Sequence, residues 1–257
     1  AAHGIDAQKE RNLSALSGRG LRLHAVGATE PGSRNYPIRI TTVARREGGT
    51  DVVNVQKIWI SRAEHSDLLV LLVRTSPGED AAKPTDGLSV LLVEMGSAIG
   101  NGLTIRPVRT MLNHATTELF FDDLVVPAAN LIGEEGKGFR YIIDGMNAER
   151  ILIASECIGD GRFFIDRAAA YARERSVFGR PIGQNQGVQF PIARAHIMVT
   201  AAAEMVAKAA AMFEPGVPCG TESTLPTLPA SKPPCLAPHL SLQTPVRSVV
   251  SETDVTA

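Results

Sequence analysis

The hydrophobic residues of this chain change their spacing along its length, and each spacing predicts a different kind of element. From about residue 24 to residue 132, short β-branched runs alternate with clusters of Gly, Pro and Asp, as in Ile38 to Val43, Lys57 to Ile60 and Leu68 to Val73. Such runs are typical of β-strands. Several strands at short spacing without intervening helices predict an antiparallel barrel or sandwich.

Beyond that zone the pattern becomes helical. Residues 137–213 are rich in strong helix formers, as in A-A-A-Y-A-R-E-R-S-V-F and A-A-A-E-M-V-A-K-A-A-A-M-F, and they predict long helices. A shorter helix is predicted from Asp6 to Leu16, before the turn from Ser17 to Gly20. The predicted fold class is α+β, a β domain followed by a helical one.

The last zone, residues 214–257, is rich in proline, serine and threonine. Proline removes an amide donor and fixes φ, so we expect no packed helix to run through this segment. The composition predicts a disordered or extended tail.

Composition and charge exclude several classes of protein. The chain has 26 basic and 27 acidic residues and a net charge of −1, so neither nucleic acid nor an anionic membrane surface is an expected partner. No apolar run approaches the length of a membrane span. The first residues show no signal core and no initiator Met, so we expect the chain to be internal to a longer product.

The cysteines favour an intracellular protein. Cys157, Cys219 and Cys235 lie far apart and form no C-x-x-C motif. This spacing fits neither a disulfide scaffold nor a zinc site, so reduced thiols and no metal are expected.

Two short motifs in the β zone carry candidate chemistry. Thr29 to Gly32 reads T-E-P-G, and Asn54 to Ser61 reads N-V-Q-K-I-W-I-S. Taken alone, both are weak signals. A turn with Pro and Gly is common, and a single Trp is most often a core or interface residue.

The segment from Asn147 to Phe190 holds polar residues at places that helix packing alone does not require. Glu149 and Arg150 precede an apolar run, and three further residues flank a Gly/Pro corner at 179–183: Arg175, Phe178 and Gln186. Without further context, Arg175 is better explained by a surface ion pair. The alternative for Glu149 is a solvated residue in the first turn of a helix.

Together, in this order and at this spacing, the motifs resemble those of the acyl-CoA dehydrogenases, flavoenzymes that desaturate acyl thioesters. Matching segments also occur at Arg62 to Asp67, at Asn113 to Pro127 and at Ile132 to Phe139. The resemblance covers roughly residues 4–213. It implies a remnant of an N-terminal helical domain, a middle β domain, a partial C-terminal helical domain and the tail, at residues 1–24, 25–132, 133–213 and 214–257.

The resemblance implies FAD as the cofactor and assigns its contacts. Ser61 would face flavin N5, and Trp59 would pack against the isoalloxazine ring. Ala28 and Thr29 would meet the pyrimidine end of that ring. The pyrophosphate and adenosine half, often of a neighbouring subunit's cofactor, falls to the three residues at the corner: Arg175, Phe178 and Gln186.

The resemblance also implies a catalytic base. Most family members carry it as a Glu in a late helix, whereas a subset that resembles the isovaleryl and long-chain enzymes carries it in an E-R pair, here Glu149 and Arg150. We therefore expect Glu149 to take the α-proton of the substrate, with its pKa raised by burial. Substrate contacts are expected from Asn35, and from Asn147 and Arg150 at the thioester.

The family further implies an acyl-CoA substrate, a trans-2-enoyl-CoA product and an electron-transfer flavoprotein as electron acceptor. It implies a homo-oligomer, either dimer or tetramer. The expected location is the mitochondrial matrix in a eukaryote and the cytoplasm in a bacterium.

Three departures from the family pattern leave alternatives open. The G-S-D that follows T-E-P is replaced by Arg34, Asn35 and Tyr36, and the Gly of N-G-x-K is replaced by Val55. Both ends also lack the helical segments of the family. A catalytically inactive truncated or splice fragment, associated with full-length subunits, is therefore the alternative to an active enzyme. A β-rich binding module without a cofactor is the third possibility.

Overall fold

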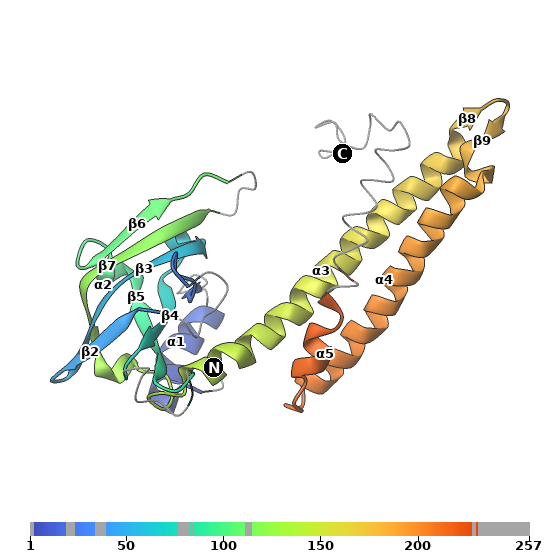
Figure 1. Cartoon of the computed structure of the whole chain (residues 1–257). Coiled ribbons are helices and arrows are strands. Elements are labelled where there is room, and N and C mark those ends of the chain that lie inside the picture. The colour runs from blue at the N-terminus through green and yellow to red at the C-terminus, as the bar shows by residue number, and fades with distance from the viewer. Residues whose placement is uncertain are drawn as a thin grey trace. The chain divides into compact units, whose positions relative to one another are not determined.

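The computed structural model contains two compact units, residues 1–143 and residues 144–257 (Figure 1). The residues that the structure describes are 3–18, 24–33, 40–76, 83, 85–110, 115–227 and 230.

The first unit is a curled sheet with a helix before it and short helical turns within it. Helix α1 spans Asp6–Ser17, close to the predicted range. The strands are β1 (His24–Gly27), β2 (Val43–Glu47), β3 (Thr50–Ser61), β4 (Leu68–Arg74), β5 (Leu88–Glu94), β6 (Leu103–Pro107) and β7 (Thr116–Pro127). The short helices are η2 (Ala63–His65), α2 (Met95–Ala98) and η3 (Ala128–Asn130). This arrangement confirms the predicted α+β class.

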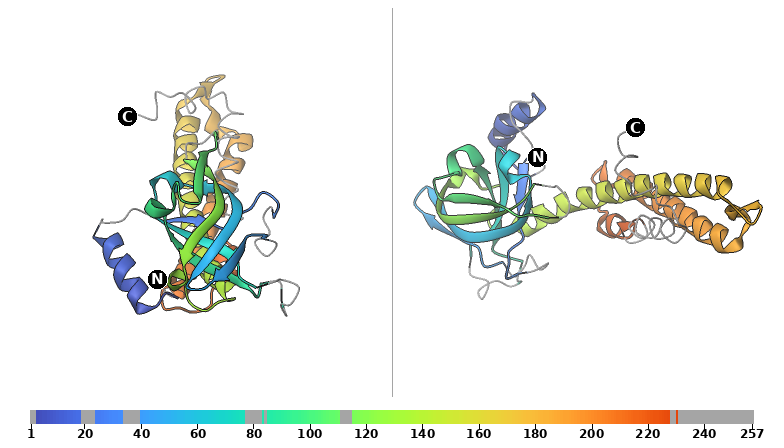
Figure 2. Two further views of the ribbon diagram at one scale, coloured as in Figure 1. Left: turned by 90° about the vertical axis from the view of Figure 1, so that its left-hand side faces the viewer. Right: turned by 90° about the horizontal axis from the view of Figure 1, so that it is seen from above.

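The strands form one sheet in the order β1-β4-β2-β3-β7-β6, with β5 paired to β4. The β2–β3, β3–β7, β6–β7 and β4–β5 pairs are antiparallel, as expected. Strand β1 instead runs parallel to β4, from His24 opposite Leu68 to Gly27 opposite Leu71. The sheet curls around its own interior (Figure 2).

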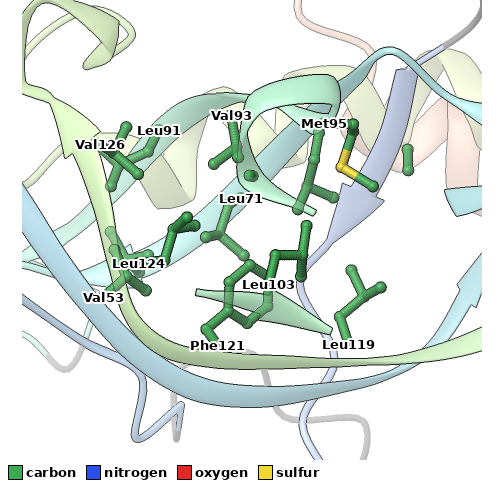
Figure 3. Close-up of a cluster of buried hydrophobic side chains, with 14 of the residues drawn as sticks. Val53, Leu71, Leu91, Val93, Met95, Leu103, Leu119, Phe121, Leu124 and Val126 are labelled. Carbon is green, nitrogen blue, oxygen red and sulfur yellow. The ribbon is translucent and has the colours of Figure 1, made fainter. Parts of the chain in front are cut away.

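The interior of the curl is the core of the first unit. Inward-facing residues alternate along β7 on each side of an irregularity at Asp122 and Asp123. Leu119, Phe121, Leu124 and Val126 thus meet side chains from the other strands and from α2 (Figure 3). Period-two alternation is the expected pattern for a strand with one buried face. Strand β5 is different, because all residues from Leu88 to Val93 are buried.

The strand predicted from Ile38 to Val43 does not form as predicted. Within its described part, Ile40 to Thr42 have no strand assignment, and β2 begins at Val43. The reason is local. The backbone amides of Thr41 and Thr42 donate to the carboxylate of Glu30, at 2.7 and 3.1 Å, and not to a neighbouring strand.

The second unit is a helical hairpin. Helix α3 (Gly138–Glu174), which starts in the first unit, is followed by β8 (Ser176–Val177), β9 (Arg180–Pro181), η4 (Ile182–Gln184) and α4 (Gln186–Phe213). The two long helices run side by side (Figures 1 and 2). Their contact is a line of buried residues at helical spacing: Ala154, Ile158, Ile165, Ala195, Val199, Ala202 and Val206. The long helices predicted within residues 137–213 are confirmed.

The start of the predicted tail is ordered, which corrects the expectation for residues 214–227. Helix α5 spans Gly220–Thr224, between Pro218 and Pro226. No proline lies inside this helix, so its amides remain available as donors. Cys219, Ser223 and Ala230 are all buried, and Ala230 belongs to the core of the helical unit. Residues 231–257 lie outside the described part of the chain.

Helix α4 corrects the expectation that no apolar segment is long enough to span a membrane. Within the described residues it is long and apolar enough to cross a membrane, by length and composition alone, and 22% of its most apolar window is buried. One line of that helix packs against α3, while Phe190, Ile197 and Phe213 remain exposed. The apolar residues of α4 thus form two groups: a line that packs against α3 and a face that is exposed.

The ordered segment after Glu214 predicts an effect of truncation. We expect a chain that ends at Phe213 to lose about 2 kcal/mol of stability relative to one that ends at Ala230, because the contacts of α5 and Ala230 are removed. Thermal unfolding of both chains, followed by circular dichroism, measures the difference. Equal melting temperatures would show that residues 214–230 add nothing to the helical unit.

Candidate functional site

The turn after β1 is hydrogen-bonded to strand β3. Ala28 and Thr29 follow the last residue of β1 and are half-buried. The ammonium of Lys57 donates to the carbonyl of Ala28 at 3.3 Å, and the amide of Ile58 donates to the carbonyl of Thr29 at 3.0 Å. Two neighbouring residues of β3 therefore hold the two carbonyls of this turn.

The same lysine forms a buried ion pair. Lys57 Nζ lies 3.0 Å from Glu30 Oε1, and the two side chains are 0% and 3% exposed. The Glu30 carboxylate also accepts hydrogen bonds from the amides and the hydroxyls of Thr41 and Thr42. A buried carboxylate requires such partners, since burial without them costs several kcal/mol.

Burial and pairing act in opposite directions on these two groups. Burial lowers the pKa of Lys57 to about 8, although the Glu30 carboxylate acts to raise it. Burial raises the pKa of Glu30, but the Lys57 ammonium and the donors of Thr42 and Thr41 outweigh it and leave that pKa below its ordinary value. Glu30 is therefore ionised at neutral pH. It faces Lys57, whose pKa lies below the usual value for a lysine.

Two residues after Lys57, strand β3 has a bulge that carries Trp59. Lys57 pairs with Leu119 and Ile60 with Thr117, so that two residues of β3 face one residue of β7. Trp59 has φ of +63°, which is rare for a bulky residue, and its side chain is 59% exposed. The usual core position of a lone Trp is not observed, and its large ring is available to a ligand.

Ser61 ends the same strand. Its side chain is exposed, and its strand position pairs with Thr116. The hydroxyl of Thr117 donates to the carbonyl of Ile60 at 2.9 Å, which fixes the strand beside Ser61. The first unit thus brings together four of the predicted residues: Ala28, Thr29, Trp59 and Ser61.

In the second unit, Glu149 lies on α3 and is exposed. The burial expected for a base is not provided by the described chain. Next to it on the helix, Arg150 donates to Oδ1 of Asn147 at 2.9 Å, and the buried Ser223 of α5 donates to the same oxygen at 3.2 Å. Two predicted substrate contacts, Asn147 and Arg150, are therefore linked to α5, a helix that the sequence did not predict.

The Gly/Pro corner is a two-stranded hairpin. Phe178 and Gly179 connect β8 and β9, with φ of +53° and +78°, and Phe178 is fully exposed at the tip. Two residues with positive φ are typical of a type I′ turn. A Cβ added to Gly183 would lie 2.8 Å from the carbonyl oxygen of Ala172, so only glycine allows the corner to pack this closely on α3.

The other two residues predicted at the corner are also exposed. Arg175 follows the end of α3, and Gln186 is the first residue of α4. Among the described residues, Arg175 has no carboxylate partner, so the surface ion pair of the alternative interpretation is not formed there. Its guanidinium is free to meet an anionic ligand.

Three residues of these sites were not predicted from the sequence: Glu30, Lys57 and Ser223. Glu30 and Lys57 stand inside the quoted motifs T-E-P-G and N-V-Q-K-I-W-I-S, so a signal was present in the chain. Ser223 lies in the segment predicted to be extended. Asn35, the remaining predicted substrate contact, lies outside the described residues.

These residues fit FAD in chemistry and exposure. A flavin ring requires an aromatic or apolar wall and hydrogen-bond donors, which Trp59 and Ser61 offer. A pyrophosphate and an adenine require a cation and a stacking face, which Arg175 and Phe178 offer. In the described part of the chain, no group of three or more His, Cys, Asp or Glu side chains is arranged to hold a metal ion.

The strained turn at Phe178 predicts that a residue better suited to positive φ stabilises the hairpin. Phe178→Asn creates the Asn-Gly pair favoured in type I′ turns, and we expect a gain of about 1 kcal/mol in the free energy of unfolding. Urea unfolding measures it. A loss of stability in this variant would mean that the exposed phenylalanine makes contacts that offset its strain.

The lowered pKa of Glu30 predicts acid sensitivity. The stabilisation from ionised Glu30 is fully present above its ordinary pKa of 4.5 and is lost as the pH falls through the lower folded pKa. We expect Glu30→Gln to be less stable than the wild type at pH 7, with the difference shrinking below pH 4.5. Urea unfolding at several pH values tests this. A constant difference at all pH values would contradict it.

Comparison with known proteins identifies the two units. The "Acyl-CoA dehydrogenase, middle domain" family matches residues 25–124, and the "Acyl-CoA dehydrogenase, C-terminal domain" family matches residues 136–231, a range that includes α5. The chain is 35% identical over 214 residues to cyclohex-1-ene-1-carbonyl-CoA dehydrogenase of Syntrophus aciditrophicus, covering 82% of this chain and 50% of that protein.

Two further proteins agree. The short-chain-specific acyl-CoA dehydrogenase of Clostridium acetobutylicum is 34% identical, with 84% of this chain and 56% of that protein covered. The structure of butyryl-CoA dehydrogenase from Megasphaera elsdenii has a TM-score of 0.87 at 28% identity, with 98% and 65% covered. The chain spans about half the length of the curated relatives. With both domains matched in order, this chain belongs to the acyl-CoA dehydrogenase family.

Proposed function

We propose that this chain is the central part of an FAD-dependent acyl-CoA dehydrogenase. The observation that carries the proposal is the edge formed by Trp59 and Ser61, where a large aromatic ring is exposed on a bulge with positive φ. A protein that only had to fold would not require this conformation, which costs of order 1–3 kcal/mol. A flat aromatic ligand at this edge gives the exposed ring its function.

The proposed reaction converts an acyl-CoA thioester to its trans-2-enoyl-CoA. The α-proton passes to the carboxylate of Glu149, which becomes a carboxylic acid, and the β-hydrogen leaves with its electron pair. Bound FAD would supply the acceptor for that hydride, at flavin N5. The exposure of Glu149 makes its carboxylate accessible to a substrate.

Other residues of the chain would position the reactants. Arg150 and Asn147, joined by a hydrogen bond of 2.9 Å, would hold the thioester end of the acyl group. Ser61 would donate to the flavin, while Trp59 would shield one side of its ring. Asn35 would contact the substrate from the loop after the T-E-P-G turn.

The helical hairpin would bind the pyrophosphate and adenosine half of an FAD. Arg175, Phe178 and Gln186 are exposed around one corner, an arrangement suited to the pyrophosphate and adenosine of FAD. As the family resemblance implies, that cofactor can belong to a neighbouring subunit of a dimer or tetramer. The proposed electron acceptor is an electron-transfer flavoprotein, and the proposed location is the bacterial cytoplasm or the mitochondrial matrix.

A second function is favoured by the exposure of Glu149. Its side chain lacks the burial expected for a catalytic base. This observation favours a catalytically inactive form of the enzyme that acts by association with full-length subunits. The uncovered face of α4, with Phe190, Ile197 and Phe213, is consistent with such association.

Visible absorption separates the two functions. After incubation with FAD and removal of the excess, the active enzyme should retain flavin bands, and acyl-CoA should bleach them. Glu149→Gln should abolish bleaching and keep the bound-flavin spectrum, because only the base is lost. Glu156→Gln is the matched control, since Glu156 is an exposed residue two turns further along α3.

Each outcome is informative. A chain that retains no flavin is not an active dehydrogenase by itself, and the hypothesis of an inactive form then stands. Bleaching that persists in Glu149→Gln would remove Glu149 as the base. Loss of bleaching in Glu156→Gln as well would point to a general disturbance of α3.

A further inference from the structure

We propose that Glu30 and Lys57 are positioning residues, whose buried ion pair holds the turn after β1 against the bulge that carries Trp59. This inference rests on the proposed function, because the turn and the bulge are the two parts of the flavin edge. Neither side chain of the pair would touch the cofactor.

The contacts of the pair reach both parts of the edge. On one side, Lys57 Nζ donates to the carbonyl of Ala28 at 3.3 Å, and Glu30 lies in the turn itself. On the other side, Lys57 is the last residue of β3 before the bulge that contains Ile58 and Trp59. A shift of either partner therefore moves the turn and the bulge relative to each other.

Contacts with Thr41 and Thr42 fix the carboxylate of Glu30 in place. Thr41 and Thr42 donate two amides and two hydroxyls to Glu30, and the amide of Arg74 in turn donates to the carbonyl of Thr42 at 2.7 Å. The pair is thus tied to the end of β4 as well as to β1 and β3. Among its described neighbours, the carboxylate has a donor on each of its two oxygens.

The physical role of the pair follows from what a buried ion pair contributes. Replacing such a pair by apolar side chains of similar size is often neutral for stability, because the desolvation penalty offsets the attraction. Its hydrogen bonds are directional, however, and apolar side chains cannot replace them. The pair therefore fixes the relative positions of the turn and the bulge. The strained backbone at Trp59 requires such fixed positions.

The test replaces both partners together, as Glu30→Gln with Lys57→Met, so that no charge is left buried and unpaired. The matched control is Arg46→Gln with Asp51→Asn. It removes a different ion pair, which lies in the β2–β3 hairpin with 2.6 Å between Arg46 Nε and Asp51 Oδ1. Circular dichroism confirms folding. Trp59 is the only tryptophan of the chain, so its emission and its quenching by acrylamide report on the bulge without any flavin.

We expect the double variant at the buried pair to change the emission of Trp59 and to weaken FAD binding by about 10-fold, whereas the control pair changes neither. Unchanged Trp59 emission and quenching in the folded double variant would overturn the inference. A wild-type chain that binds no FAD would refute the proposed function, and the emission of Trp59 would still decide the inference.

A milder variant covers the case in which the double variant does not fold. Thr42→Val removes one hydroxyl donor from Glu30 and leaves both partners of the pair in place. We expect a smaller change of Trp59 emission in the same direction, with the protein folded. Emission identical to that of the wild type would overturn the inference in this case.

Discussion

A lysine and a glutamate buried together behind the sheet edge constrain much of the first unit. Glu30 takes the amides of Thr41 and Thr42, which explains why the chain has no strand there despite its β-branched residues. Lys57 holds the turn after β1 and precedes the bulge of β3. Because a buried charge needs all its partners, these segments cannot move independently.

Two aromatic residues, Trp59 and Phe178, combine a positive φ with an exposed ring. Trp59 lies on a bulge of the sheet, and Phe178 lies at the tip of the helical hairpin. Both conformations are unfavourable for a bulky side chain, and both rings are presented to solvent. In the proposed enzyme they meet the two halves of the same cofactor type, the ring system and the adenosine. Strain placed on an exposed ring has a physical reason when a ligand covers that ring.

The fold could be predicted well where one local property dominates. The strong helix formers of residues 137–213 predicted the long helices, and the run from Leu68 to Val73 predicted β4. Prediction was wrong where the local structure depends on contacts with residues far away in the sequence. Composition suggested an extended chain after Glu214, but α5 forms because Ser223 and Ala230 find buried positions against the long helices. The parallel pairing of β1 with β4 also depends on the curl of the sheet and has no local signal.

The sequence by itself determined the family and the identity of the candidate groups, since motifs such as T-E-P-G and I-W-I-S are linear patterns of side-chain types. It determined the long helices for the same reason, because helix formation depends on neighbours a few residues apart. Only the tertiary structure decided that Glu30 and Lys57 form a pair, that Trp59 is exposed, and that Ser223 binds Asn147. These features depend on residues 27 to 76 positions apart, or on a local backbone conformation imposed by strand pairing.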